Sequence, residues 1–168
     1  MRTYSHVALT YAALRLAACP ANEATLAALG AALPDLPAGA GWAWLRTRDR
    51  SATREDFDTE VCGRSVFRVP DTALHSFPIL LAAVFVSLFV LRNSGVGRVF
   101  LLGWTGHLVV DLLTHSSDAR PQFWPFTGWR FVSLVSYRES ERHGLAVAVA
   151  EHALVALALI STRRGLRR

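Results

Sequence analysis

The sequence predicts an all-α membrane protein of about five helices, with three or four of them in or at the bilayer. Of its 168 residues, 52% are hydrophobic and only 18% are charged. The mean hydropathy of +0.28 exceeds that of a typical soluble domain. Three long apolar blocks occupy residues 77–91, 99–115 and 144–160. A soluble bundle with very apolar core helices is the alternative, because these blocks are short for a span of about 20 residues.

Two helices are predicted before the apolar blocks, over residues 5–18 and 22–33. Pro20 ends the first, and Asn22 is a candidate N-cap for the second. We interpret the first as a retained amphipathic helix rather than a signal peptide, because polar residues interrupt its apolar stretch. The LPDLP segment, residues 33–37, is then expected to break the chain sharply.

Two polar segments separate the predicted helices. Residues 38–70 are rich first in glycine and then in charged side chains, so we expect a loop with limited structure. Residues 116–142 are polar and aromatic, and we expect a second loop there. The helices and both loops together are expected to form one membrane-embedded domain over residues 1–168.

The distribution of arginines bears on the orientation in the membrane. Arg92, Arg98 and the arginines that close the chain favour a cytoplasmic location for those helix ends. His75 and His115 would then lie towards the extracytoplasmic face. The arginines between residues 46 and 68 oppose this orientation, since they would also be outside.

Charge and cysteine content exclude two classes of function. The net charge of +5 is spread over loops and the C-terminal end, without a helical arginine stripe or an aromatic stacking platform, so we expect no nucleic-acid partner. Cys19 and Cys62 stand in no metal-ligand spacing and are expected to be free thiols.

The segment GHLVVDLLTH, residues 106–115, carries the strongest chemical signal. It places His107, Asp111 and His115 four residues apart in a run otherwise made mostly of leucine and valine. Side chains at positions i and i+4 of a helix lie on one face, so an imidazole and a carboxylate there can hold one divalent metal. Ionisable groups in such an apolar run are costly to bury without a partner. His115 also suits the end of a helix through the helix dipole.

Three earlier residues are candidates to complete a site, and each has a simpler interpretation. His6 could be a polar residue at a helix start, and His75 could flank the first apolar block. Asp35, between two prolines, could cap a turn or could present a ligand from a rigid corner. Glu151 and His152 could pair with a neighbouring helix. Imidazoles with carboxylates suit Zn, with Mn or Fe as alternatives, rather than Ca or Mg.

The order of several short motifs resembles the membrane-bound metal-dependent hydrolase family of bacteria and archaea, a group labelled YdjM-like, LexA-binding inner-membrane hydrolases. The motifs are His6, LPD at 33–35, HS at 75–76, GHLVVDLLTH at 106–115 and WPF at 124–126. They cover most of residues 1–130. The resemblance implies a multi-pass protein of the cytoplasmic (inner) membrane of a prokaryote, with the lipid bilayer as its partner.

The ligand order is also similar to that of zinc-dependent phospholipase C, an all-α family that binds a cluster of zinc ions. This resemblance implies one or two ions, with Asp111 as the bridge and ligands from His6, Asp35, His75, His107 and Asp111. The chain departs from that pattern because it lacks the further HxxxE pair. It departs from the hydrolase pattern at Leu74, where threonine is usual.

Two functional hypotheses follow. The first is a hydrolase that uses metal-activated water on a phosphoester or a lipid-like ester. Asp35 or Asp111 would act as base, Arg120 and Arg130 would neutralise an anionic substrate, and the remaining substrate-side or supporting residues would be Ser76 and His115. The second is a non-enzymatic membrane protein, in which these side chains bind a structural metal or form a polar helix-packing network. Absence of a GxSxG motif argues against a serine hydrolase, and absence of a repeat argues against a transporter.

Overall fold

The computed structural model describes residues 1–90 and 95–165, and the described chain is all-helical, as predicted. The predicted cytoplasmic markers at Arg92 and at the last two arginines lie outside the described residues. Within these described ranges, seven helices have nine residues or more: α1 (Thr3–Leu16), α2 (Ala21–Ala32), α3 (Leu36–Arg48), α5 (Ser65–Leu74), α6 (Phe77–Phe85), α7 (Gly95–Thr114) and α8 (Gly144–Gly165). Shorter pieces are 3₁₀ turns at Leu33–Asp35 and Ser140–Arg142, π turns at Phe57–Val61 and Val86–Val90, and α4 (Arg54–Asp56).

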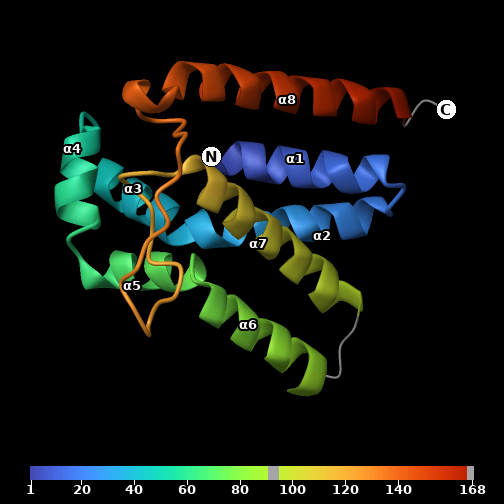
Figure 1. Ribbon diagram of the computed structural model, residues 1–168, viewed down its shortest axis with the longest axis horizontal. Helices are drawn as coiled ribbons and strands as arrows, with labels where there is room; N and C mark the ends of the chain where they lie inside the picture. Colours follow the sequence, from blue (N-terminus) through green and yellow to red (C-terminus); the bar gives the residue numbers. More distant parts are fainter. Residues whose placement is uncertain (91–94, 166–168) are drawn as a thin grey trace.

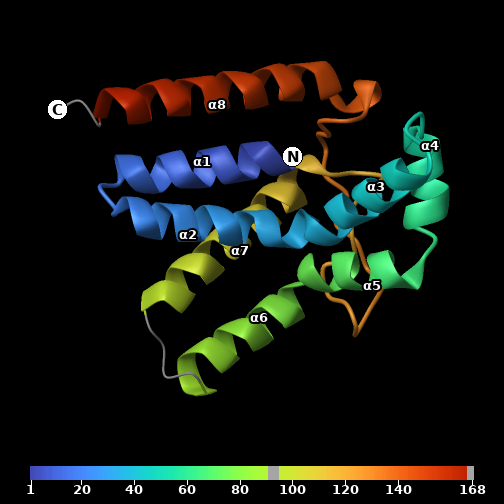
Figure 2. The same ribbon diagram turned by 180° about the vertical axis from the view of Figure 1, so that it is seen from behind.

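Helices α8, α1 and α2 lie side by side, with α1 in the middle (Figure 1). Helix α7 crosses α2, and α6 packs against α7 on the side away from α1, as the view from behind also shows (Figure 2). One end of the molecule gathers the start of α1, the end of α7, and helices α3 to α5. We call this end the site end.

Small residues allow α2 and α7 to approach closely. A Cβ atom added at Gly103 of α7 would lie 1.8 Å from the Ala27 carbonyl oxygen of α2, and one added at Gly30 would lie 2.0 Å from the Phe100 carbonyl oxygen. Neither backbone can yield without separating the helices. Such small-residue contacts are the usual way in which helices pack in membranes.

Among the described residues, two helices, α7 and α8, are long and apolar enough to cross a membrane. The pair α5–α6 passes the same test as one unit but is bent by 67° at its break, so it is either a broken span or a re-entrant segment. Most apolar side chains of α8 are exposed. These features are consistent with a membrane protein that has two or three spans.

The expectation of a loop over residues 38–70 is wrong, because most of that segment is helical. Its apolar residues form a core of their own, with Leu45, Phe57 and Val61 buried and aromatic side chains packed around them. The sequence interpretation gave too much weight to the charged residues between these positions.

The LPDLP segment does not break the chain sharply either. Pro34 and Pro37 stand in the first turns of the 3₁₀ turn and of α3, where a missing N–H leaves no helical hydrogen bond unmade. Asn22 is inside the first turn of α2 rather than its N-cap, which is Pro20.

Residues 115–139 contain no helix or strand, and they pack back onto the site end. The Ser133 hydroxyl donates to the Leu113 carbonyl at 2.6 Å, and the Phe77 amide donates to the Gln122 carbonyl at 2.9 Å. These contacts hold the segment against the end of α7 and the start of α6, beside the residues described next.

Candidate metal site

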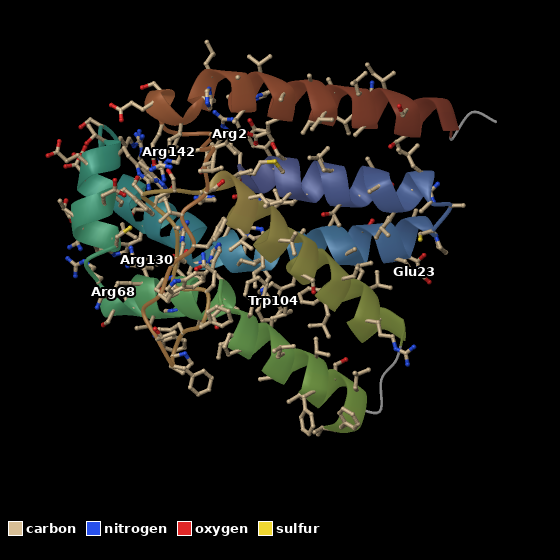
Figure 3. The ribbon with its side chains drawn as sticks, viewed as in Figure 1. Arg2, Glu23, Arg68, Trp104, Arg130 and Arg142 are labelled. Carbon is tan, nitrogen blue, oxygen red and sulfur yellow. The ribbon has the colours of Figure 1, made fainter. Side chains whose placement is uncertain are left out.

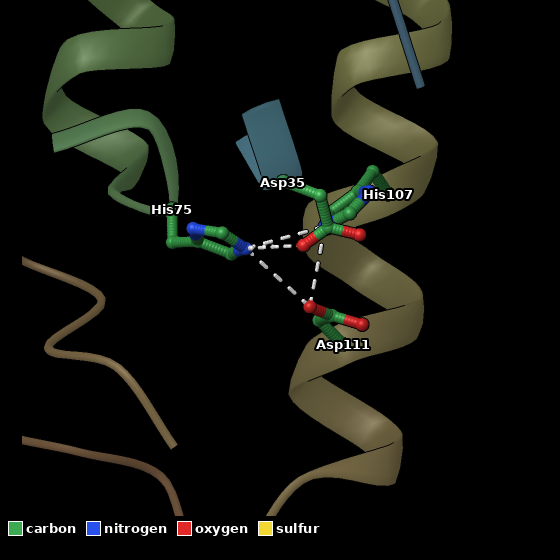
Figure 4. Close-up of side chains that lie close together, drawn as sticks. All are labelled: Asp35, His75, His107 and Asp111. Atoms are coloured by element: carbon green, nitrogen blue, oxygen red, sulfur yellow. Dashed lines mark hydrogen bonds and ion pairs between the residues drawn. The ribbon is translucent and has the colours of Figure 1, made fainter. Parts of the chain in front are cut away.

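Four side chains from three separate parts of the chain converge at the site end (Figure 4). His107 and Asp111 lie one turn apart on the inner face of α7. His75 is the C-cap of α5, and Asp35 ends the 3₁₀ turn after α2. The three residues other than Asp35 are buried, and Asp35 is partly exposed.

The donor atoms of these four residues surround one point. His107 Nε2 lies 3.2 Å from Asp111 Oδ2 and 3.3 Å from His75 Nε2. His75 Nε2 lies 3.6 Å from both Asp35 Oδ1 and Asp111 Oδ2, and His107 Nε2 lies 3.8 Å from Asp35 Oδ1. A tetrahedral ion with bonds of about 2.0–2.2 Å separates its donor atoms by about 3.3–3.6 Å. The four residues therefore form a group that could hold a metal ion.

The two histidines are oriented by their outer ring nitrogens. His107 Nδ1 donates to the Ala31 carbonyl at 2.7 Å, and His75 Nδ1 donates to the Asp71 carbonyl at 2.7 Å. A carbonyl oxygen only accepts, so each Nδ1 carries a proton, and the remaining ring nitrogen, Nε2, faces inward with a lone pair available to a metal once it is deprotonated. Metal-ligating histidines typically have such an outer partner.

Asp35 offers a charged oxygen to the same point. Burial alone would raise the pKa of Asp35, but the neighbouring His75 and His107 imidazoles and the Thr3 hydroxyl together hold that pKa below its usual range. The carboxylate is therefore ionised and acts only as an acceptor. Two carboxylates and two imidazole lone pairs form a donor set that favours a divalent cation.

Asp111 has a second set of contacts on its other oxygen. His6 Nε2 lies 2.9 Å from Asp111 Oδ1, His115 Nε2 lies 3.3 Å from it, and the Met1 nitrogen lies 2.9 Å from it. The His6 ring also stacks on His107, with ring centroids 3.9 Å apart. His6 and His115 thus contact the site through Asp111, and neither belongs to the group of four.

The other predicted site residues have identifiable contacts. Ser76 is fully buried, donates to the Trp124 carbonyl at 2.8 Å and caps α6, so it joins the WPF segment to the site end. Arg120 forms a two-pronged ion pair with Asp71 at 2.9 and 3.2 Å. Arg130 is exposed in the loop.

Glu151 and His152 lie outside the group of four. Buried Glu151 pairs with Arg2 at 3.0 Å, and exposed His152 contacts the Tyr4 hydroxyl at 2.7 Å. Both therefore link α8 to the start of α1.

Sequence reasoning missed two acidic residues that support the site. Asp71 precedes His75 by four residues, a spacing that mirrors the HxxxD pattern and was available as a signal. Asp118 follows His115 by three residues, with Asp118 Oδ1 and His115 Nδ1 3.0 Å apart, and it pairs with Arg138 at 2.7 Å. The Ala31 carbonyl carried no sequence signal, because any residue has one.

A cavity of about 1240 Å³ opens beside the group of four at the site end. Asp35, His115 and Asp118 line it together with residues of helices α3 and α5. The candidate metal site is therefore next to a space large enough for a bulky ligand.

Comparison with protein-family models, curated proteins and solved structures finds no match to this chain. Fold and site together describe an all-α protein with two or three candidate membrane spans and a group of side chains that could bind a metal.

Proposed function

We propose that this protein is a membrane-bound, metal-dependent hydrolase that acts on a phosphoester or a lipid-like ester. The observation that carries the proposal is the convergence of Asp35, His75, His107 and Asp111 next to a large cavity. The resemblance of the motif order to membrane-bound metal-dependent hydrolases and to zinc-dependent phospholipase C supplies the reaction class. A bound Zn, Mn or Fe ion would act as a Lewis acid and lower the pKa of water towards neutrality.

The residues of the chain divide this task between them. His75, His107 and Asp111 hold the ion, and the outer hydrogen bonds of the two histidines fix their orientation. Asp35 is both a ligand and the member of the group that lines the cavity, so of the two candidate bases it is the one that can contact a substrate there. Arg120 supports the site indirectly, because it forms an ion pair with Asp71, whose carbonyl orients His75.

The proposal allows the site to hold either one ion or two. The ligands of a second ion would be Asp111 Oδ1 with His6 and His115, whose Nε2 atoms already face that oxygen. Asp111 would then bridge both ions, which is how two-metal sites commonly share a carboxylate.

A second candidate function is a structural metal site. Four protein ligands complete the tetrahedral shell of a structural zinc, whereas catalytic zinc usually has three and an open position. The adjoining cavity favours the hydrolase, and the count of four ligands favours the structural role.

Metal analysis combined with a substrate panel separates these functions. We expect the protein purified in detergent to contain about one or two equivalents of Zn, Mn or Fe and to hydrolyse a phosphoester or phospholipid. Removal of the ion with a chelator should abolish activity, and adding it back should restore it. A folded protein without metal would contradict both candidates, and bound metal without hydrolysis of any phosphoester or phospholipid would favour the structural one.

The proposed location is the cytoplasmic membrane of a prokaryote, with the site on the extracytoplasmic side. Native cysteines test this, since exposed Cys62 lies between α4 and α5 at the site end and Cys19 lies in the turn between α1 and α2 at the other end. Intact bacterial cells expressing Cys19→Ser and Cys62→Ser variants are treated with a membrane-impermeant maleimide. We expect Cys62 to react in intact cells and Cys19 only after permeabilisation.

The labelling should be run at alkaline pH, because partial desolvation and then the neighbouring Asp58 carboxylate raise the pKa of the Cys62 thiol. Labelling of the denatured variants controls for thiol oxidation. The reverse pattern, with Cys19 reactive in intact cells, would place the site in the cytoplasm.

A further inference from the structure

The cavity at the site end has an apolar and aromatic side. Trp42, Phe57 and Val61 line it together with Phe67 and Leu36. Leu36 is also exposed. This lining suits a hydrocarbon or aromatic portion of a ligand.

The same cavity has an excess of positive charge. Six arginines line it, and four of these form ion pairs with carboxylates: Arg2 with Glu151, Arg54 with Asp58, Arg120 with Asp71 and Arg138 with Asp118. Arg68 and Arg130 make no ion pair and no side-chain hydrogen bond with any residue in the described ranges. Figure 3 shows both at the site end, beside α5.

The net charge of the cavity depends on these two arginines. The four ion pairs cancel, and a divalent ion would cancel the charges of Asp35 and Asp111. Arg68 and Arg130 then give the cavity two positive charges that no described side chain balances, in addition to the Met1 ammonium that contacts Asp111. A phosphate ester carries one or two negative charges, and the planar guanidinium group matches its oxygens with two parallel hydrogen bonds.

We propose that Arg68 and Arg130 bind the phosphate group of an amphiphilic phosphoester, whose apolar portion lies against Leu36, Trp42 and Phe67. The proposal rests on the function proposed above, and it assigns the substrate class and two specificity residues to that site. Arg120 is not a substrate-binding residue, because both prongs of its guanidinium are occupied by Asp71.

Ligand binding to the purified full-length protein in dodecyl maltoside tests this. Trp42 and Trp124 line the cavity, so their fluorescence reports occupancy. The probes are inorganic phosphate, phenyl phosphate, dihexanoyl phosphatidic acid and uncharged dihexanoylglycerol, each below its micellar concentration. We expect phenyl phosphate or dihexanoyl phosphatidic acid to bind at least about tenfold more tightly than inorganic phosphate, because only they fill the apolar side. Tighter binding of the lipid indicates a membrane-borne substrate, and tighter binding of phenyl phosphate indicates a soluble one.

Arg68→Gln and Arg130→Gln are each expected to weaken binding of the preferred phosphoester about tenfold, as expected for the loss of one charge-assisted contact. Arg64→Gln is the matched control, since Arg64 is also exposed, precedes Arg68 by four residues and stacks on Trp44 outside the cavity lining. It should bind as the wild type does. Metal content is measured in every variant and should not change.

Equal binding by wild type and both glutamine variants would overturn the inference, and so would equally tight binding of uncharged dihexanoylglycerol. Those outcomes leave the hydrolase proposal standing if metal and activity are present. If instead the protein contained no metal but bound the phosphoester through these arginines, the hydrolase proposal would be wrong and the phosphoester site would stand.

Discussion

Replacing His107 with alanine is expected to abolish metal binding. His107 supplies the donor atom nearest to those of both Asp111 and His75, at 3.2 and 3.3 Å, so its loss opens one side of the group. Removal of an outer hydrogen-bond partner alone typically lowers metal affinity about 10–100-fold, and removal of a ligand should exceed this. Metal content after dialysis, and the rise in melting temperature on adding zinc, measure the effect. The wild type should be stabilised by zinc and the variant should not, because ligand binding stabilises only a state that binds.

His152→Ala serves as the control for this experiment. His152 is exposed on α8 and contacts the Tyr4 hydroxyl, away from the group of four. It should retain the metal and the zinc-dependent shift. Because His107 is fully buried, Asp35→Asn is a second test with little change in shape, and it should also lose metal affinity. If both His107→Ala and Asp35→Asn retained the metal, the group of four would not be the metal site.

The helical class and the pairing of His107 with Asp111 were predictable for physical reasons that operate locally. The i, i+4 spacing of His107 and Asp111 fixes a common helix face whatever the rest of the chain does. Their position in an apolar run required a partner for buried charge, and a metal is one such partner. The convergence of Asp35 and His75 on this face could not be derived from spacing, because it depends on how α2 and α5 pack. Only the resemblance in motif order suggested it.

The role of His6 shows the limit of residue type as a guide. The resemblance implied His6 as a ligand of one or two ions, and its Nε2 faces Asp111 Oδ1, whereas His107 faces Asp111 Oδ2. Which oxygen of a carboxylate a histidine meets depends on the rotation of α1 against α7. That rotation comes from tertiary packing, which no short motif encodes.

The prediction of a loop over residues 38–70 was wrong for a different reason. Its charged residues are on the outside of helices whose apolar side chains meet in a small separate core around Phe57 and Val61. Charge density suggested a loop, whereas Trp42 stacks on Phe57 and Trp44 packs against Phe67, contacts that join the helices of this segment. This error concealed the walls of the cavity, and with them the context of Arg68.

Replacing Gly103 with alanine is expected to destabilise the protein strongly. The new Cβ would lie 1.8 Å from the Ala27 carbonyl oxygen, and this oxygen belongs to the backbone of α2, so the helices must separate. Overpacking of this kind typically costs about 1–3 kcal/mol. The cost should appear as a lower melting temperature in detergent. The metal affinity should fall as well, because Ala31 of α2 accepts the hydrogen bond that orients His107.

Gly106→Ala on the same helix makes the test specific, since nothing lies within 4 Å of a Cβ added there. Alanine favours a helix over glycine by up to about 1 kcal/mol, so this variant should be as stable as the wild type or more stable. Replacement of glycine by alanine at these two positions, three residues apart, should therefore change the stability of the protein in different directions. If Gly103→Ala leaves both the melting temperature and the metal affinity unchanged, then α2 and α7 are not in backbone contact, and the Ala31 carbonyl cannot be what orients His107. If Gly103→Ala lowers the melting temperature but not the metal affinity, the close packing of α2 and α7 is supported. The metal affinity would then not depend on that packing.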